Sequence, residues 1–230
     1  MNDLTIIYYT ANTIPDFTGQ RVRGYLLATV GNRFPIISVS QKPIDFGQNI
    51  CVGPIGKSKY NAYKQILIGV KAVKTKYVAT VDDDALYPLN HFAYRPPENT
   101  FAYDTNMWFA DEKGYYWQRQ EADERRGMYS CITQSQTLLD NLTQRYAFYP
   151  QDPLPNRDIA WGEPGTLDFQ FKIKSKYLLF ASAEPTVVFR YRDSMGGGHL
   201  GRFPMPPPQY LCYNLKPFGG IRKLLSSYWV

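Results

Sequence analysis

The stretch that decides the fold reads Tyr77-Val78-Ala79-Thr80-Val81-Asp82-Asp83-Asp84. Its first five residues are β-branched, aromatic or small, which predicts a buried strand. The three adjacent carboxylates that follow repel one another by roughly 1 kcal/mol per pair even in water. A chain tolerates such a run where a cation neutralises it, or where water screens it in a turn that caps the next helix. Because the acids follow a buried strand directly, the sequence favours the cation.

Upstream of the acids, apolar residues alternate between strand and helix patterns. Thr18 is the expected N-cap of the first helix. The expected elements are strands at 5–9, 34–40 and 77–81 and helices at 18–30 and 58–71, with a glycine-containing loop at 47–56. Three strands with two intervening helices are typical of right-handed βαβ units in a parallel sheet.

The pattern changes after about residue 90. Strands are expected at 101–110, 169–173 and 186–191, and a helix within 130–146, with a proline-containing loop at 149–155. The sequence therefore predicts a single α/β domain over 1–230, with a mostly parallel central sheet and a mixed C-terminal half.

The composition narrows the class of protein. Hydrophobic residues make up 44% and charged residues 20% of the 230, which excludes a disordered chain. Three widely spaced cysteines and two histidines form neither a disulfide framework nor a zinc site. The N-terminus lacks the pattern of a signal peptide, and no run of about 20 apolar residues occurs. We therefore expect a cytoplasmic protein.

The position of the acids indicates what they bind. They lie at the carboxyl end of a strand, where parallel α/β sheets bind ligands. If the extended path continues, Asp82 and Asp84 face the same way, because side chains alternate along a strand. Two carboxylates on one face suit Mg²⁺ or Mn²⁺, which usually complete their shell with substrate phosphates.

The order of motifs over residues 5–90 resembles the glycosyltransferases of the GT-A fold, most closely the large inverting family 2. Asp82-Asp83-Asp84 is similar to their DxD-type motif, and the turn Thr10-Ala11-Asn12 resembles their uridine-contacting loop. Asn61 matches the last residue of their Ala-Arg-Asn pattern, with Lys59 or Tyr60 in place of the arginine. The resemblance implies a Rossmann-like domain whose half 1–90 binds a nucleotide sugar and whose half 91–230 binds the acceptor.

The same resemblance implies individual roles. Asp82 would contact the ribose or base, Asp84 would hold the divalent metal, and Asp83 could share either role. The uridine-contacting turn favours a UDP-sugar as donor. The implied donor-binding residues are Thr10, Asn12, Gln41, Lys57, Lys59, Asn61, Asp82 and Asp83, and the implied metal ligands are Asp84, Asp82 and His199. The metal would stabilise the leaving diphosphate as a Lewis acid.

Transfer to a hydroxyl also needs a base. The resembled family supplies it as an Asp in a Glu-Asp pair, but here Pro164 follows Glu163 at the position of that Asp. Glu163 is the favoured base, with Asp168 or Asp158 as alternatives. Two readings need no base in this segment: an enzyme that retains configuration, or a plain surface turn at 162–165.

The acceptor is left open among a glycan, a lipid carrier, a protein and a modified DNA base. The net charge is +6, and residues 186–230 hold six Lys or Arg against one acid, which fits a nucleic acid partner. The segment 221–229 either lies on a membrane surface or packs back as a final helix. Two other functions compete with glycosyl transfer: a Mg²⁺-dependent nucleotidyltransferase, and a non-catalytic module that binds an anionic polymer.

Overall fold

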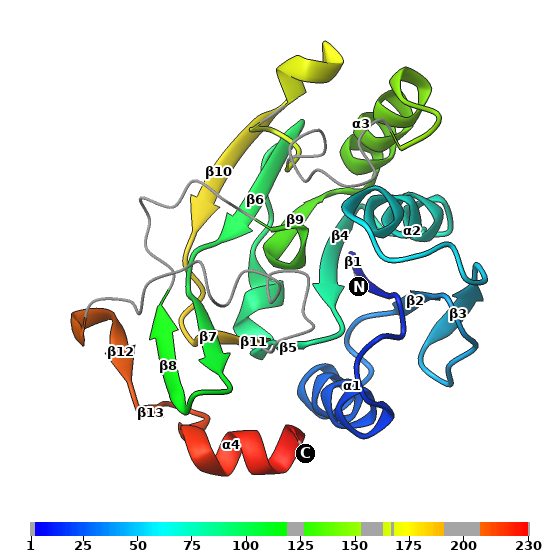
Figure 1. Ribbon diagram of the computed structural model, residues 1–230. Coiled ribbons are helices and arrows are strands. Elements are labelled where there is room, and N and C mark those ends of the chain that lie inside the picture. The colour runs from blue at the N-terminus through cyan, green and yellow to red at the C-terminus, as the bar shows by residue number, and fades with distance from the viewer. Residues whose placement is uncertain (1–2, 119–126, 153–162, 167, 191–207, 230) are drawn as a thin grey trace.

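Seven strands form the main sheet of the computed structural model, which describes residues 3–118, 127–152, 163–166, 168–190 and 208–229 (Figure 1). In spatial order they are β10 (Lys176–Phe180), β6 (Thr100–Asp104), β9 (Cys131–Gln134), β4 (Tyr77–Asp82), β1 (Leu4–Thr10), β2 (Ile36–Ser40) and β3 (Gln48–Cys51). Neighbouring strands are parallel, except that β9 runs antiparallel to both β4 and β6.

A second sheet of five strands lies beside the first. In spatial order it contains β12 (Leu211–Cys212), β8 (Tyr115–Gln118), β7 (Met107–Asp111), β11 (Thr186–Arg190) and β5 (Ala85–Leu86). Only β7 and β11 are parallel in this sheet. A short hairpin of β13 (Asn214–Leu215) and β14 (Gly219–Gly220) precedes the last helix. The predicted α/β domain, with its mostly parallel central sheet and mixed C-terminal half, is confirmed.

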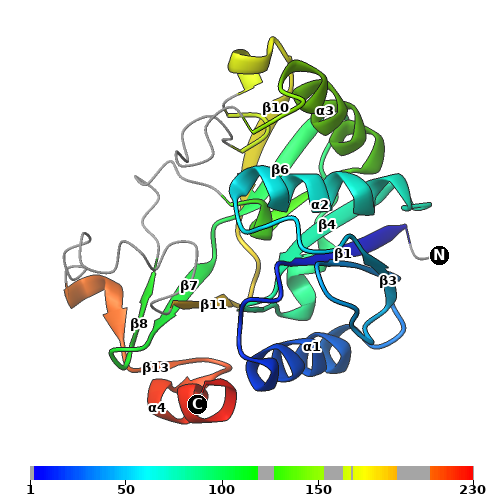
Figure 2. The same cartoon turned by 45° about the vertical axis from the view of Figure 1, so that its right-hand side comes forward.

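Helices cover both faces of the main sheet (Figures 1 and 2). The described helices are α1 (Asp16–Val30), α2 (Lys59–Lys71), α3 (Ser135–Phe148) and α4 (Ile221–Tyr228), with short 3₁₀ helices η1 (Leu89–Ala93), η2 (Met128–Ser130), η4 (Asp168–Phe171) and η6 (Pro208–Tyr210). Helices α2 and α3 lie on one face of the main sheet and α1 on the other, whereas α4 packs against α1 and the second sheet. Ile7 and Tyr9 of β1 pack against α2 and α3, whereas Ile6 and Tyr8 pack on the side of α1. The alternation of the strand thus builds two cores. In the part of the chain that is placed, no helix is long and apolar enough to cross a bilayer.

Helix α2 begins and packs as its sequence predicts. The Ser58 side chain accepts a hydrogen bond from the backbone N–H of Asn61, which caps the helix. Gly69 allows α2 to approach β1 and β2 closely, since a Cβ there would lie 2.9 Å from Ile7 Cγ2 and 3.1 Å from Val39 Cγ2. This close approach brings the loop before α2 toward the carboxyl ends of β1 and β2.

Two expectations were wrong near the first helix and the glycine-containing loop. Thr18 is not the N-cap of α1, because the helix begins at Asp16 after Pro15, and Thr18 is buried within the first turn. The loop at 47–56 contains an additional strand, β3, at the edge of the sheet. Asn49 joins it to β2, because its amide donates at 2.9 Å to both Ser38 Oγ and Ser40 Oγ.

Two other expectations fail where the chain turns sharply. The strand expected at 101–110 is divided into β6 and β7, because the Asp104 carboxylate accepts the backbone N–H of Asn106 at 2.9 Å and closes a turn. The strand expected at 169–173 is the 3₁₀ helix η4, and the strand β10 comes later. Here Asp168 binds Arg145 instead of continuing an extended chain.

The two sheets are joined where the chain runs from a strand of one sheet directly into a strand of the other. The chain passes from the main sheet to the second sheet between β4 and β5, between β6 and β7, and between β10 and β11. Asp104 holds the last two crossings together, since its Oδ1 also accepts the backbone N–H of Ser182 at 3.0 Å. Its Oδ2 lies 2.8 Å from Nδ1 of the buried His91. The first crossing carries the three aspartates.

Candidate functional site

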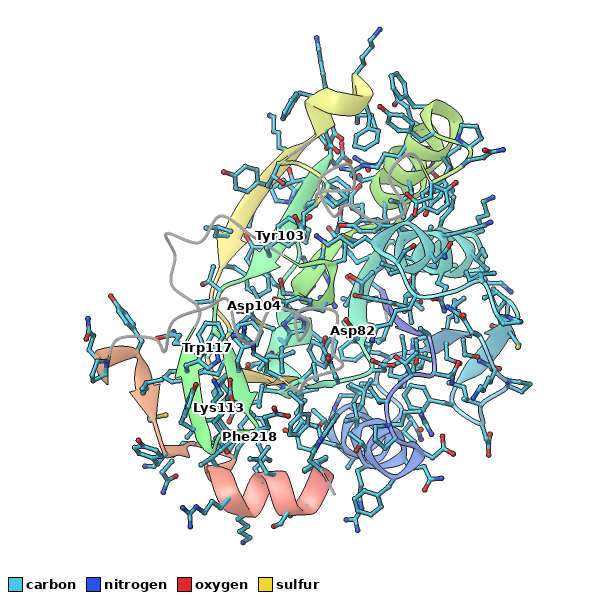
Figure 3. All side chains as sticks on the ribbon, in the orientation of Figure 1. Asp82, Tyr103, Asp104, Lys113, Trp117 and Phe218 are labelled. Atoms are coloured by element: carbon cyan, nitrogen blue, oxygen red, sulfur yellow. The ribbon has the colours of Figure 1, made fainter. Side chains whose placement is uncertain are left out.

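The three aspartates lie at the carboxyl end of β4, and Figure 3 shows Asp82 there. Asp82 is the last residue of β4 and pairs with Tyr9 of β1. Asp83 and Asp84 form a turn before β5. The backbone N–H of Phe189 in β11 donates to the carbonyl oxygen of Asp84 at 2.8 Å. The cluster is therefore held from both sheets.

The three carboxylates converge. One oxygen from each of Asp82, Asp83 and Asp84 lies within 4.8 Å of the other two. The extended path considered from the sequence would bring only Asp82 and Asp84 together, whereas the observed turn adds Asp83. The Thr10 hydroxyl donates to the buried carboxylate of Asp83, and the backbone N–H of Asp83 donates to Asp82 Oδ1 at 2.9 Å. Three convergent carboxylate oxygens are a donor set that fits Mg²⁺ or Mn²⁺.

The pKa values of the three carboxyl groups are also relevant to cation binding. Burial is the largest cause that raises the pKa of each of the three carboxyl groups. Burial and the charge of Asp83 raise the pKa of Asp82 to about 8. The Lys57 ammonium lowers the pKa of Asp83 and Asp84 but does not offset their burial. A bound divalent cation would lower the pKa of all three carboxyl groups and favour their charged forms.

Tyr87, which the sequence did not single out, forms a hydrogen bond with the backbone of the acid cluster. The buried Tyr87 hydroxyl accepts the backbone N–H of Asp82 at 3.0 Å and donates to the carbonyl oxygen of Tyr129 at 2.8 Å. Tyr87 follows β5, so its place beside Asp82 depends on the turn between the two strands. Its position directly after two apolar residues was the only signal in the sequence.

The loop after β1 is ordered by its own side chains. Asn12 has a positive φ of 55°, and its backbone N–H donates to Thr10 Oγ1 at 2.8 Å. The Asn12 side-chain oxygen accepts the backbone N–H groups of Gln41 and Lys42, each at 2.8 Å. Asn12 therefore ties the ends of β1 and β2 together. Its implied contact with a nucleoside remains a prediction.

The loop before α2 is joined to the same edge of the sheet. The buried Gln41 side chain donates to the carbonyl oxygen of Gly56 at 2.9 Å and accepts its backbone N–H at 3.1 Å. The Asn61 amide donates to Ile55 O at 2.6 Å and to Gly56 O at 3.2 Å. Both side chains shape the loop that carries the exposed Lys57. Lys59 is the first residue of α2.

Gln65 is a second residue that the sequence reasoning missed. It lies on the buried face of α2, and its amide donates at 2.8 Å to the carbonyl oxygens of both Thr10 and Val39. A polar residue within the apolar stripe of a helix was the available signal. Gln65 fixes α2 against the ends of β1 and β2.

The structure separates the two leading candidates for the base. Glu163 is half-buried, its charge helps to raise the pKa of Tyr63 and Tyr103, and the carbonyl oxygen of the next residue, Pro164, accepts the Tyr103 hydroxyl at 2.7 Å. Tyr63 in turn lies near Tyr9, whose hydroxyl is 3.5 Å from Asp82 Oδ2. Glu163 is thus connected to the acid cluster through two tyrosines.

Asp168 is enclosed by partners instead. Its carboxylate binds the buried Arg145 at 2.6 Å, accepts the Asn141 amide and the backbone N–H of Gly165, and accepts the hydroxyl of Ser175. A carboxylate with these four donors is suited to fix the turn before η4, and the implied role of Asp168 as a base remains a prediction. Asp158 and His199 lie outside the described residues.

The second sheet carries an ordered aromatic stack. The rings of Phe109 and Trp117 stack with centroids 4.4 Å apart, and the Arg190 guanidinium lies 5.1 Å from the Trp117 centroid. Arg190 follows Phe189, the residue that contacts Asp84. Arg190 thus lies on β11, the strand that borders the acid cluster, whereas Phe109 lies on β7 and Trp117 on β8, where Figure 3 shows it.

The C-terminal segment does not present an apolar face to a membrane. Ile221 and Leu224 of α4 are buried, in a cluster that includes Tyr25 of α1 and Phe189 of β11. Of the two readings of 221–229, the final helix that packs back is confirmed. The apolar side of α4 is used inside the molecule.

The two sheets and the helices around them form a GT-A-like fold. No protein-family model and no curated protein matches the sequence. Among solved structures, a glycosyltransferase involved in the glycosylation of the major capsid of PBCV-1 is similar, with a TM-score of 0.50 and 7% identity over 77% of this chain and 81% of that one.

Two further solved structures are less similar. The glycosyltransferase GlyE of Streptococcus pneumoniae TIGR4, in its apo form, has a TM-score of 0.48 and 10% identity, over 77% of this chain and 45% of that one. A nucleotidyl transferase from Methanothermobacter thermautotroptrophicus has a TM-score of 0.46 and 11% identity, over 80% of this chain and 89% of that one. At these identities the comparisons establish the fold alone, and membership of family 2 remains a prediction.

Proposed function

We propose that this protein is a metal-dependent glycosyltransferase that moves a sugar from a nucleoside-diphosphate sugar to an acceptor hydroxyl. The observation that carries the proposal is the convergence of Asp82, Asp83 and Asp84 at the carboxyl end of β4. Their raised pKa values are ones that a bound divalent cation would lower, and the fold is shared with a glycosyltransferase.

In this proposal, Asp82 and Asp84 hold Mn²⁺ or Mg²⁺, and Asp83 fixes the turn through Thr10. The cation, when bound, supplies Lewis-acid stabilisation of the leaving diphosphate. The turn at Thr10–Asn12 and the loop at Gly56 border the nucleoside, and Lys57 faces the diphosphate. Residues 1–90 therefore form the donor half and residues 91–230 the acceptor half.

We assign the base to Glu163. The carbonyl oxygen of Pro164, the residue after Glu163, accepts the Tyr103 hydroxyl at 2.7 Å, and Tyr103 belongs to the same buried cluster as Tyr9, which lies beside Asp82. Its carboxylate would accept the proton of the acceptor hydroxyl as that oxygen bonds to the sugar carbon and the nucleoside diphosphate leaves. The acceptor hydroxyl must lose one proton, and the Glu163 carboxylate accepts it.

The donor is expected to be a UDP-sugar, and the acceptor remains open among the four classes named from the sequence. The competing nucleotidyltransferase is less well supported, since such enzymes need a glycine-rich, basic segment after the first strand. Residues 10–18 contain no Lys or Arg.

Two measurements test the proposal together. The first is thermal unfolding with UDP-, GDP-, CMP- and dTDP-sugars, with and without Mn²⁺, in which a ligand at 100 times its Kd adds about 2.7 kcal/mol. The second identifies the product. Release of a nucleoside diphosphate supports glycosyl transfer, whereas release of pyrophosphate from a nucleoside triphosphate would show a nucleotidyltransferase. If no nucleotide sugar stabilises the protein in the presence of Mn²⁺, the proposal fails.

A further inference from the structure

A basic and aromatic surface, here called the tip, begins at η4 at the edge of the molecule and continues along β10. It consists of Phe169, Lys172, Lys174, Lys176, Tyr177 and Leu179. The 3₁₀ helix η4 is at the outer edge of the structure in both views, at the top of Figures 1 and 2, beside the C-terminal part of α3. It lies away from the second sheet and from the acid cluster at the end of β4.

The apolar side chains of the tip are unusually exposed. Phe169 is 71% exposed, Tyr177 45% and Leu179 41%. Tyr177 and Leu179 alternate along β10 and so share one face of that strand. Exposed apolar groups that gather in one patch mark an interaction surface, whereas single exposed ones are ordinary.

Two other residues of η4, Asp168 and Phe171, are buried and hold Phe169 in its exposed position. Two residues along, Phe171 is only 1% exposed, and the Arg145 guanidinium lies 4.4 Å from its ring centroid. The Arg145–Asp168 ion pair anchors the other end of the same 3₁₀ helix. The chain thus directs one phenylalanine inward and holds the other in water.

The charge of the tip has one sign. Lys172, Lys174 and Lys176 are all exposed, while Asp168 is buried and neutralised by Arg145. The neighbouring exposed acid is Glu98, next to Asn99, whose amide donates to the carbonyl oxygen of Lys174. Asp140 of α3 is a second exposed acid, next to Asn141, whose amide lies 3.3 Å from Ser175 Oγ. Among the described residues, three lysines therefore face these two carboxylates, which leaves a net positive charge.

We propose that this tip docks the protein on an anionic lipid bilayer. Phe169 would lie among the lipid headgroups, and the lysines would contact lipid phosphates. The position of the tip at the outer edge favours a flat surface over a nucleic acid strand, which is usually bound along a groove. The aliphatic Leu179 also suits a lipid environment, because it offers no face on which a base can stack.

The experiment is cosedimentation of the full chain with lipid vesicles. Neutral phosphatidylcholine vesicles are compared with vesicles that contain about one third phosphatidylglycerol, at low and at physiological salt. The tip variant is Phe169→Ser/Lys172→Glu/Lys174→Glu. The control variant, Tyr213→Ser/Arg222→Glu/Lys223→Glu, removes an exposed ring and changes the same charge at the C-terminal segment. Thermal unfolding shows whether both variants remain folded.

We expect the wild-type chain and the control variant to sediment with the anionic vesicles only. The tip variant should bind them at least about tenfold more weakly, since each lysine contributes to attraction by an anionic membrane. The proposal is overturned if the wild type does not bind, if the tip variant binds equally, or if the control loses as much. It is also overturned if the tip variant loses binding to single-stranded DNA or self-association but not to vesicles. None of these results depends on the glycosyltransferase assignment.

Discussion

The backbone N–H of Asp82 donates a hydrogen bond to the Tyr87 hydroxyl at 3.0 Å, which fixes the end of β4 from inside the protein. Because Tyr87 also donates to the carbonyl oxygen of Tyr129, one phenol joins the acid cluster to the segment before β9. The backbone position of Asp82 therefore depends on a residue that is not one of the three aspartates.

The change Tyr87→Phe tests this dependence. We expect Mn²⁺ affinity to fall several-fold, because a lost hydrogen bond is worth about 1 kcal/mol and leaves the Asp82 N–H without its acceptor. Electron paramagnetic resonance of free Mn²⁺ measures the affinity directly. Tyr213→Phe, on a ring that is 66% exposed, is the control. Equal Mn²⁺ affinity in both variants would show that Tyr87 does not position the cluster.

The raised pKa of Asp82 predicts a pH dependence of stability. A carboxyl group whose pKa rises on folding from 3.8 to about 8 contributes stability that is present below pH 4 and lost as pH rises through 8. The metal-free protein should therefore lose free energy of unfolding as pH rises over this range, relative to Asp82→Asn. Urea unfolding at pH 5 and pH 9 measures the difference. If the free energy of unfolding changes equally with pH in the wild type and in Asp82→Asn, the raised pKa of Asp82 is not the cause of the pH dependence.

Glu163 and Asp168 should respond to substitution in opposite ways. Glu163→Gln is expected to lower kcat about 100-fold or more and to leave thermal stability nearly unchanged. Asp168→Asn leaves Arg145 buried without its counter-charge and should cost about 3 kcal/mol of stability. Thermal unfolding and product release, measured on both variants, distinguish the roles. A stable but inactive Asp168→Asn would return the base to Asp168.

Two glycine substitutions test the packing that positions the loop before α2. Gly69→Ala should destabilise the protein by about 1–3 kcal/mol, because the new Cβ would crowd Ile7 and Val39. Gly24→Ala, on the exposed side of α1, meets nothing within 4 Å and should stabilise it by about 0.5–1 kcal/mol. Chemical unfolding of the pair measures both effects. The same sign for both substitutions would refute the close approach of α2.

The sequence predicted the parts of the fold that depend on local pattern. The strands at 77–81 and 34–40 and the helix at 58–71 follow hydrophobic periodicity, and the structure has them. The division of 101–110 into β6 and β7 escaped prediction, because it depends on Asp104, which binds His91 and Ser182 from distant segments.

The candidate site also has one part that the local sequence predicts and another part that depends on distant residues. The acid cluster could be placed, because three aspartates after a buried strand are a local signal. The turn that adds Asp83 to the cluster depends on Thr10, 73 residues away in the chain, and could not be read from the local sequence. Asp168 was an alternative to the favoured Glu163 in the sequence, and its contacts with Asn141 and Arg145 of α3 could not be read from the local pattern.

Mn²⁺ binding by the wild type and by Asp84→Asn, measured by paramagnetic resonance at pH 8.5, tests the central claim most directly. We predict saturable binding at one site in the wild type, a loss of about 100-fold or more in Asp84→Asn, and no change in Asp140→Asn, whose exposed carboxylate lies on α3. Unchanged Mn²⁺ affinity in Asp84→Asn, or no saturable binding by the wild type, would contradict the account.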